Sequence, residues 1–104
     1  MERFDIYLVS LDPTVGSEIK KTRPCLILSP DEMAVLKTAL IAPMTTKGFH
    51  FPTRIPVTFQ NKKGQIVLDQ IRAVDKSRLI KKVGRLHKLT ITQVLNVLQE
   101  MFAL

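Results

Sequence analysis

One polar segment of this sequence combines charged residues suited to phosphate chemistry with direct entry into an apolar stretch. Residues 16–24 contain three cations and a single acid, Glu18, and they end in Arg23 and Pro24. Because proline biases the preceding residue toward an extended backbone, we expect the Arg23 guanidinium at the entrance of the following strand. A planar guanidinium can hold two non-bridging phosphate oxygens, so this position suits the binding of a phosphate group.

A second polar segment follows the next apolar run. Residues 43–48 contain two hydroxyls and an ammonium, those of Thr45, Thr46 and Lys47, which form a donor cluster suited to a phosphate. The alternative for either polar segment is a plain turn in which hydroxyls cap backbone groups.

Other catalytic chemistries find little support in the residue spacing. Cys25, His50 and His87 are scattered, and no Cys-x-x-Cys or His-x-x-x-His pair occurs, so we expect no metal site. No glycine-rich phosphate loop is present, which argues against ATP and dinucleotide cofactors. Because Cys25 lies within an apolar run, we expect a buried thiol that packs as a small hydrophobic group.

The positive charge of the chain is concentrated in its second half. The 104 residues carry a net charge of +7, yet residues 1–52 hold six basic and six acidic side chains, whereas residues 53–104 hold ten and three. Most of the excess forms a stripe from Arg72 to Lys88, which contains one acid, Asp75. Such a stripe is typical of a protein with a polyanionic partner. The alternatives are a solvated surface and a patch that an acidic protein covers.

Length and hydropathy predict a single domain, residues 1–104, that is not a membrane protein. A chain of this length buries enough surface to fold as one unit. No apolar run approaches the roughly 18 residues of a membrane span. The first ten residues include three charged side chains and precede no apolar core, unlike a signal peptide, so we expect a cytoplasmic location.

The elements that must position these side chains are short β-strands separated by turns. Runs typical of strands occur at residues 5–10, 24–29, 39–42, 55–59 and 65–71. The second and third runs are continuously apolar, which is typical of strands buried on both faces. A turn at 61–64 between the last two runs predicts a hairpin. Residues 31–36 predict one or two helical turns capped by Ser29 or Asp31, and 80–86 fit either a strand or a helix.

The end of the chain predicts one amphipathic helix. Thr90 and Gln93 fit a capping box at its start. The apolar residues at helical spacing are Ile91, Val94, Leu95, Leu98, Met101 and Phe102. Five to seven short strands followed by a helix predict a mainly β (α+β) domain, in which a small, strongly curved sheet or barrel packs against the helix.

Four blocks of the sequence occur in an informative order and spacing. They are residues 11–18, 22–30, 42–46 and 67–79. Together they resemble the successive signatures of the MazF/PemK family of toxins from type II toxin–antitoxin systems. The resemblance implies an SH3-like curved β-barrel with short helices and a C-terminal helix. It also implies a homodimer that an acidic, partly disordered antitoxin neutralises.

The activity implied by this resemblance is metal-independent, sequence-specific cleavage of single-stranded RNA without a cofactor. In the family the 2′-hydroxyl of the substrate attacks, which leaves a 2′,3′-cyclic phosphate and a 5′-hydroxyl. By position, the catalytic arginine of the family falls on Arg23 and its catalytic threonine on Thr45. Glu18 matches a position that contributes to RNA binding or catalysis. Ser17 and Val67 replace a histidine and an arginine of some members, so a mechanism that needs either does not transfer.

Further residues are expected to bind RNA. We expect Lys47 and Arg72 to meet phosphates and Asp69 and Gln70 to read base edges, while the alternative is a structural pair between Asp69 and Arg72. Phe49, Phe51 and Arg54 are candidate stacking platforms that are equally suited to packing. The full set predicted to bind RNA outside the catalytic residues is Ser17, Thr46, Lys47, Asp69, Gln70 and Arg72.

Two other functions compete with the nuclease. A CcdB-type poison of DNA gyrase has a similar fold but cuts no nucleic acid, and a binding-only RNA module would keep the fold without the chemistry. A gyrase poison needs no phosphate-facing arginine and threonine, so the Arg-Pro block followed by the threonine pair favours the nuclease. On this hypothesis the chemistry lies in the charge-balanced first half, and the basic stripe attracts RNA or docks the antitoxin.

Overall fold

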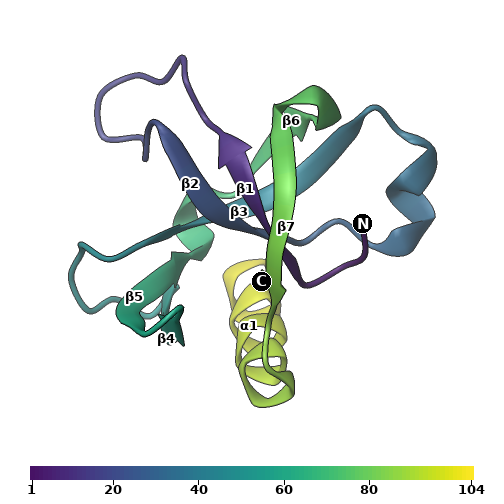
Figure 1. Ribbon diagram of the computed structural model, residues 1–104. Coiled ribbons are helices and arrows are strands. Elements are labelled where there is room, and N and C mark those ends of the chain that lie inside the picture. The colour runs from purple at the N-terminus through teal and green to yellow at the C-terminus, as the bar shows by residue number, and fades with distance from the viewer.

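The computed structural model describes residues 1–104, which form seven strands, three short 3-10 helices and one α-helix (Figure 1). The strands are β1 (Asp5–Ser10), β2 (Thr22–Ile27), β3 (Thr38–Thr45), β4 (Arg54–Phe59), β5 (Lys62–Val67), β6 (Arg72–Asp75) and β7 (Leu79–Arg85). The 3-10 helices are η1 (Asp31–Val35), η2 (Leu68–Gln70) and η3 (Lys76–Arg78), and the helix α1 spans Lys88–Met101. None of the helices combines the length and apolarity needed to cross a membrane.

The strands build one antiparallel sheet that curls on itself. Its order is β4-β5-β3-β2-β1-β7, and β6 pairs with β3 beside this path. The long strand β3 makes the curl possible, because Thr38–Ile41 pairs with β6 whereas Met44 and Thr45 pair with β5. The prediction of a small curved sheet with a C-terminal helix is confirmed, and the ambiguous residues 80–86 belong almost entirely to strand β7.

Strands β2 and β3 are buried on both faces, as their continuous apolar runs predicted. Leu26 of β2 joins the larger core cluster, which also includes Val94 of α1, whereas Cys25 and Ile27 join a second cluster with Val9 of β1. Successive side chains of a strand point to opposite faces, so an uninterrupted apolar run feeds both clusters. Cys25 is fully buried, and burial raises the pKa of its thiol to about 12. This thiol therefore packs as a hydrophobic group, as expected.

The β4–β5 hairpin is confirmed, but its turn lies earlier than predicted. Gln60 and Asn61 form the two-residue connection, and both have positive φ, 51° and 64°. Two left-handed residues match the twist of the flanking strands better than the longer turn expected at 61–64. Residues 62–64 consequently belong to β5, and this strand ends at Val67, after which η2 turns the chain into β6.

Two predicted helix caps are wrong. The turns at 31–36 form the 3-10 helix η1, whose N-cap is Pro30 without a side-chain bond, while Ser29 Oγ accepts from Leu40 N at 3.3 Å and Asp31 Oδ1 accepts from Arg3 N at 3.0 Å. Helix α1 begins at Lys88, before Thr90, because the His87 ring nitrogen accepts from Leu89 N and already caps the helix.

Helix α1 covers the larger core cluster and lies beside β4, below the sheet in Figure 1. Val94 is fully buried, and the other apolar residues of α1 that pack on this cluster are Ile91, Leu95, Val97, Leu98 and Met101. Phe102, which was predicted to continue this apolar face, is 74% exposed because the helix ends at Met101. The helix thus closes one side of the curl and leaves the ends of β2 and β3 open.

Candidate functional site

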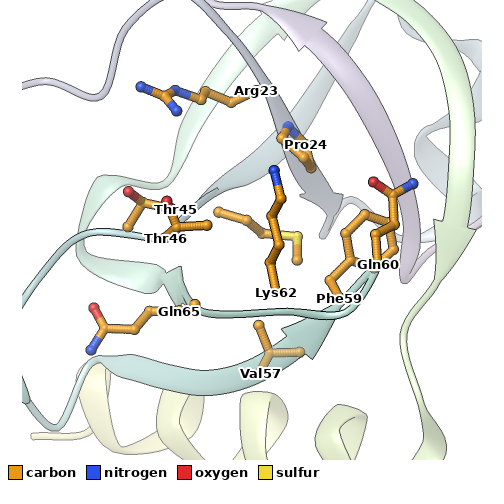
Figure 2. A pocket seen from close by; sticks show the side chains of 11 residues that line it. Arg23, Pro24, Thr45, Thr46, Val57, Phe59, Gln60, Lys62 and Gln65 are labelled. Atoms are coloured by element: carbon orange, nitrogen blue, oxygen red, sulfur yellow. The ribbon is translucent and has the colours of Figure 1, made fainter.

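A pocket of about 210 Å³ lies where β2 begins and β3 ends, facing the β4–β5 hairpin. It brings together three of the predicted site residues, Arg23, Thr45 and Thr46 (Figure 2). The remaining lining residues are Pro24, Met44, Val57, Phe59, Gln60, Lys62, Gly64 and Gln65. The two polar segments of the sequence, residues 16–24 and 43–48, therefore meet at one site.

Arg23 stands at the entrance of β2, as Pro24 predicted. The register that pairs Cys25 with Pro43 brings Arg23 and Thr45 opposite each other at the ends of β2 and β3. Arg23 Nε donates to the Lys20 carbonyl at 3.2 Å, which orients the guanidinium. Its two Nη groups donate to no atom of the chain, so they are available as a fork of donors for a phosphate.

The Thr45 hydroxyl fits both hypotheses for its segment, because it caps a backbone group and can also donate to a phosphate. Its Oγ1 accepts from Lys47 N at 3.1 Å, which is the capping role of a turn hydroxyl. A hydroxyl that accepts through its oxygen still has its hydrogen to donate. Thr45 is thereby held in place with a donor available at the edge of the pocket, and the Lys47 ammonium makes no bond within the chain.

Glu18 lies in a second hollow, of about 250 Å³, rather than in the Arg23 pocket. Its Oε1 accepts from Val15 N at 2.6 Å, within the loop that joins β1 to β2. The other residues that line this hollow are Leu11, Ile19, Pro43, Asp69, Gln70, Ile71 and Arg72. The predicted site is thus divided, with Arg23, Thr45 and Thr46 in one hollow and Glu18, Asp69, Gln70 and Arg72 in the other.

The two hollows have no lining residue in common, but they follow one another along β3, because Thr45 lines the first and Pro43 the second. We call the edge where Arg23 and Thr45 face each other the rim. Side chains two residues apart in a strand point to the same face, so Thr45 shares the face of Pro43, which lines the second hollow. Arg23 shares the face of Cys25, the partner of Pro43. A phosphate bound at this rim would lie in the Arg23 pocket, and the second hollow begins two residues earlier on β3, at Pro43.

Gln70 anchors the loop that carries Glu18. Its Oε1 accepts from Ile19 N at 2.7 Å, and its Nε2 donates to the Ser17 carbonyl at 3.3 Å. The amide reaches these two residues from η2, so one side chain holds both flanks of Glu18. Sequence reasoning assigned base reading to Gln70 and RNA contact to Ser17, whereas the geometry shows that these two residues are bonded to each other.

Asp69 forms its ion pair with Arg54, and the predicted alternative pair with Arg72 is wrong. Arg54 Nη2 lies 3.2 Å from Asp69 Oδ2, and Thr53 Oγ1 donates to Oδ1 at 2.8 Å. Burial disfavours the charged carboxylate, but the hydrogen bonds from Arg54 and Thr53 outweigh it and lower the pKa of Asp69. Arg72 instead donates to the Leu11 carbonyl at 3.1 Å, and both residues line the second hollow.

The aromatic residues after the threonine pair form a small exposed platform. Phe49 and Phe51 are 60% and 54% exposed, with ring centroids 6.1 Å apart in an edge-to-face arrangement. The Arg54 guanidinium lies 4.4 Å from the Phe49 ring centroid. These side chains pack on one another and still present ring surface to solvent, which is compatible with base stacking.

The basic stripe is largely engaged in bonds within the chain. Five of its seven cations bond to carbonyl or carboxylate oxygens, and Lys81 and Lys88 make no such bond. Such bonds leave the positive charges in place, so the field of the stripe persists although its side chains are held. The five bonded residues are Arg72, Lys76, Arg78, Lys82 and Arg85.

Sequence reasoning missed the contribution of the β4–β5 hairpin. Lys62 reaches from β5 across the pocket toward β2, where Arg23 and Pro24 lie (Figure 2). Gln60 lies on the same edge, and Gln65 Nε2 donates to the Phe49 carbonyl at 2.9 Å, which holds the loop after Thr46. No local signal marked these residues, because the segment around Lys62 has the composition of an ordinary turn.

Nothing in the arrangement suggests a metal ligand set. No group of three or more His, Cys, Asp or Glu side chains lies close enough together to hold a metal ion. The Arg23 pocket is lined by a guanidinium, two hydroxyls and the Lys62 ammonium, and the Glu18 carboxylate lines the second hollow. That combination can bind and polarise a phosphodiester.

Comparison with known proteins adds an independent line of evidence. Residues 2–102 match the family described as PemK-like, MazF-like toxin of type II toxin-antitoxin system. Endoribonuclease EndoA of Bacillus subtilis (strain 168) is 32% identical over 111 residues, which cover 100% of this chain and 96% of EndoA.

Solved structures share the fold. MazF from Deinococcus radiodurans superposes with a TM-score of 0.86 at 20% identity, over 100% of this chain and 97% of that one. An endoribonuclease from a mycobacterial species, in complex with its cognate antitoxin, gives a TM-score of 0.80 at 19% identity, over 96% and 92% of the two chains. At such identities the structural likeness establishes the architecture alone.

Proposed function

This chain belongs to the PemK-like, MazF-like family of type II toxin–antitoxin toxins, and on that premise we propose that it is an endoribonuclease. We propose further that it cleaves single-stranded RNA at specific sequences without a metal ion. The observation that carries the proposal is the rim, where the Nη groups of Arg23 and the hydroxyl hydrogen of Thr45 are unused by the fold. Donors held in place but unpaired are what a scissile phosphate requires.

In the proposed reaction, the 2′-oxygen of the substrate attacks the adjacent phosphorus. The bond from phosphorus to O2′ forms as the bond to O5′ breaks, which yields a 2′,3′-cyclic phosphate and a 5′-hydroxyl. The proton of the 2′-hydroxyl leaves as the attack proceeds, and the departing O5′ takes up a proton. A carboxylate of the chain is proposed to accept the first proton, and solvent water to supply the second. No metal-bound water is needed, because the nucleophile belongs to the substrate.

Arg23 is proposed to stabilise the extra negative charge that develops on the phosphate oxygens. A guanidinium keeps its proton throughout the pH range of proteins, so its contribution is electrostatic rather than general acid catalysis. Two parallel bonds to non-bridging oxygens also orient the phosphate for in-line attack. The Thr45 hydroxyl adds a third donor from the opposite strand.

Glu18 is proposed to accept the proton of the 2′-hydroxyl. Its carboxylate lines the second hollow, and its Oε2 makes no bond within the chain. The loop that carries it is tied to Gln70 through Ser17 and Ile19, which limits the positions that the carboxylate can take. Of the two acids on this loop, Asp12 and Glu18, Glu18 is the one that lines the second hollow, together with Pro43 of β3.

Two protein partners are also proposed, an acidic antitoxin and a second copy of this chain. The mycobacterial endoribonuclease with the same fold was solved with its cognate antitoxin. The net charge of +7, with its excess in the second half, favours an acidic partner over a basic one. The basic stripe is the surface that we propose for this contact or for the initial attraction of RNA.

The two competing functions are less well supported. EndoA, a relative that matches the whole of this chain, is an endoribonuclease rather than a gyrase poison. A binding-only module would use the same guanidinium and hydroxyl to hold a phosphate without cleaving it, so cleavage itself distinguishes that function from the nuclease. A gyrase poison does not account for the convergence of Arg23 and Thr45.

The decisive experiment is to incubate the purified protein with a long RNA in excess EDTA and to map the fragment ends. Discrete cuts that leave 5′-hydroxyl and 2′,3′-cyclic phosphate ends are expected. Intact RNA with retarded mobility would indicate a binding module instead, and intact RNA together with stalled gyrase would indicate a gyrase poison. Arg23→Ala, purified in parallel, controls for a contaminating nuclease, because its preparation should lack the activity.

A further inference from the structure

The pocket beside Arg23 and Thr45 extends into an apolar recess that the proposed cleavage step does not use. Pro24 and Met44 form one side of the recess, and Val57 and Phe59 of β4 form the other. Met44 belongs to the larger core cluster, and Val57 and Phe59 pack against it, so the parts of these side chains that line the pocket form an apolar surface beside the phosphate site. Such a surface next to a phosphate site suits a flat, weakly polar group that is attached to the phosphate.

The Phe59 ring packs against Gly84 of β7, where the absence of a side chain leaves room for it. A Cβ at Gly84 would lie 2.8 Å from Phe59 Cε1 and 3.3 Å from Cζ, so the ring packs directly against the glycine backbone. An aromatic ring fixed in this way is preorganised for contact and loses little conformational entropy when a ligand binds. The recess therefore has one rigid aromatic side.

Two polar side chains at the edge of the recess have no partner within the chain. The Lys62 ammonium and the Gln60 amide make no hydrogen bond or ion pair, although both line the pocket. The left-handed Gln60 and Asn61 make the hairpin connection tight and place Gln60 two residues before Lys62 at the same edge. An ammonium provides only donors, whereas an amide provides both donors and an acceptor.

We propose that this recess binds one nucleobase of the RNA, adjacent to the scissile phosphate, and that Lys62 and Gln60 read its edge. The proposal rests on the proposed nuclease function and assigns part of its sequence specificity to the β4–β5 hairpin. A volume of about 210 Å³ is below the ~300–1,000 Å³ of sites for drug-sized ligands. It suits a single planar base packed against Phe59 and Val57.

The donor set of Lys62 restricts which base fits. An ammonium facing a base edge needs an acceptor, and uracil and guanine present a carbonyl oxygen beside a ring N–H, a combination that cytosine and adenine lack. Lys62 can donate to that oxygen while the Gln60 amide oxygen accepts from the ring N–H. The Gln60 amide can satisfy a donor and an acceptor of the same base at once. The recess is therefore expected to select uracil or guanine and to disfavour adenine.

Mapping of cleavage sites in Lys62→Met and Gln60→Ala tests this assignment. The control is Lys63→Met, which removes the same charge from the next residue of β5, outside the pocket. At one fixed position beside the cleaved bond, wild type and the control should share a preference for uracil or guanine. In Lys62→Met that preference over adenine should fall by about tenfold. An unchanged preference in both pocket variants would overturn the proposal.

A different change in the cleavage activity of Lys62→Met would show that Lys62 contacts a phosphate instead of a base. In that case Lys62→Met would slow cleavage of all sequences uniformly and would flatten the salt dependence, while the base preference stayed as in wild type. This outcome would also overturn the base assignment, and it would leave the nuclease function intact.

A binding measurement separates the recess from the cleavage chemistry. Uridine, guanosine and adenosine 5′-monophosphates are titrated into the wild-type protein while the methyl signals of Met44 and Val57 are followed by NMR. Uridine or guanosine monophosphate should shift these signals at concentrations where adenosine monophosphate does not, and Lys62→Met should abolish the difference. Shifts without RNA cleavage would support the recess and contradict the nuclease. Cleavage without shifts would contradict the recess alone.

Discussion

Gly64 of β5 lies directly against the backbone of Thr45, since a Cβ added at Gly64 would sit 2.4 Å from the Thr45 carbonyl oxygen. Neither partner can yield by rotating a side chain, because the contact is with backbone atoms. We expect Gly64→Ala to displace the end of β3 at a cost of about 1–3 kcal/mol in unfolding free energy and to lower RNA cleavage sharply. Denaturant unfolding and a cleavage assay measure the two effects.

Thr58→Ala is the matched control for Gly64→Ala, because Thr58 is an exposed residue of the same hairpin and pairs with Lys63. This control should change neither stability nor cleavage appreciably. Wild-type cleavage in a folded Gly64→Ala protein would show that the position of Thr45 is not critical.

Arg23 is expected to act through the two Nη groups that the fold leaves unpaired. Arg23→Ala should lower the turnover number by about 10²–10³-fold, because it removes a preorganised donor for the phosphate. Arg23→Lys keeps the charge but loses the planar fork, so its activity should fall between those of Arg23→Ala and the wild type. Single-turnover cleavage of a defined RNA measures both, and near-wild-type rates in Arg23→Ala would remove Arg23 from the mechanism.

Substitutions of Thr45 distinguish a structural role of its hydroxyl from a catalytic role. Thr45→Ala frees Lys47 N, which is exposed, so its unfolding free energy should fall by no more than about 1 kcal/mol. The cleavage rate should fall much further, and Thr45→Ser should restore it. If thermal unfolding and cleavage decline in parallel, and serine restores neither, the hydroxyl serves only as a cap.

Gln70 is expected to position Glu18 by holding the loop on both sides of it. Gln70→Ala removes the bonds to Ser17 and Ile19, so the loop should become mobile and cleavage should fall several-fold. Gln70→Glu keeps the acceptor for Ile19 N and should retain more activity than the alanine variant. Amide hydrogen exchange at Ile19 reports the loop directly. Full protection of that amide in Gln70→Ala would contradict the positioning role.

Asp5 makes the stability of the fold sensitive to acid. Burial disfavours its charge, but the hydrogen bonds from Glu2 N, Arg85 and Lys82 outweigh burial and hold its pKa below the ordinary value. A carboxyl with a lowered pKa in the folded state stabilises the protein above its unfolded-state pKa, and this contribution is lost as the pH falls through the folded-state pKa.

Asp5→Asn should therefore destabilise the protein by about 1–3 kcal/mol at pH 7, with a difference from wild type that shrinks at strongly acidic pH. Thermal unfolding of both proteins across the acidic range tests this expectation. The pair with Arg85 at 3.0 Å is the strongest candidate for the effect. A difference that does not change with pH would show that Asp5 acts through packing or hydrogen bonding rather than charge.

Much of the candidate site could be predicted because its signals are local in the chain. Pro24 restricts the backbone of Arg23, and Thr45 follows directly on an apolar strand, so both positions depend on neighbouring residues. The continuous apolar runs around Cys25 and Ile41 likewise predict strands buried on both faces, which the two core clusters confirm. Residue type and spacing were sufficient for these features.

Features that depend on contacts between distant segments were decided by the tertiary structure alone. Glycine is typical of turns, yet Gly64 lies in β5, where its lack of a side chain lets the strand approach Thr45, nineteen positions earlier. The choice of Arg54 rather than Arg72 as the partner of Asp69 depends on how η2 meets β4. The entry of Lys62 into the Arg23 pocket follows from the curl of the sheet.

By itself, the sequence determined which residues could bind a phosphate, because that depends on side-chain chemistry and local backbone preference. Which of them meet was decided by strand pairing over long separations, which local preference does not encode.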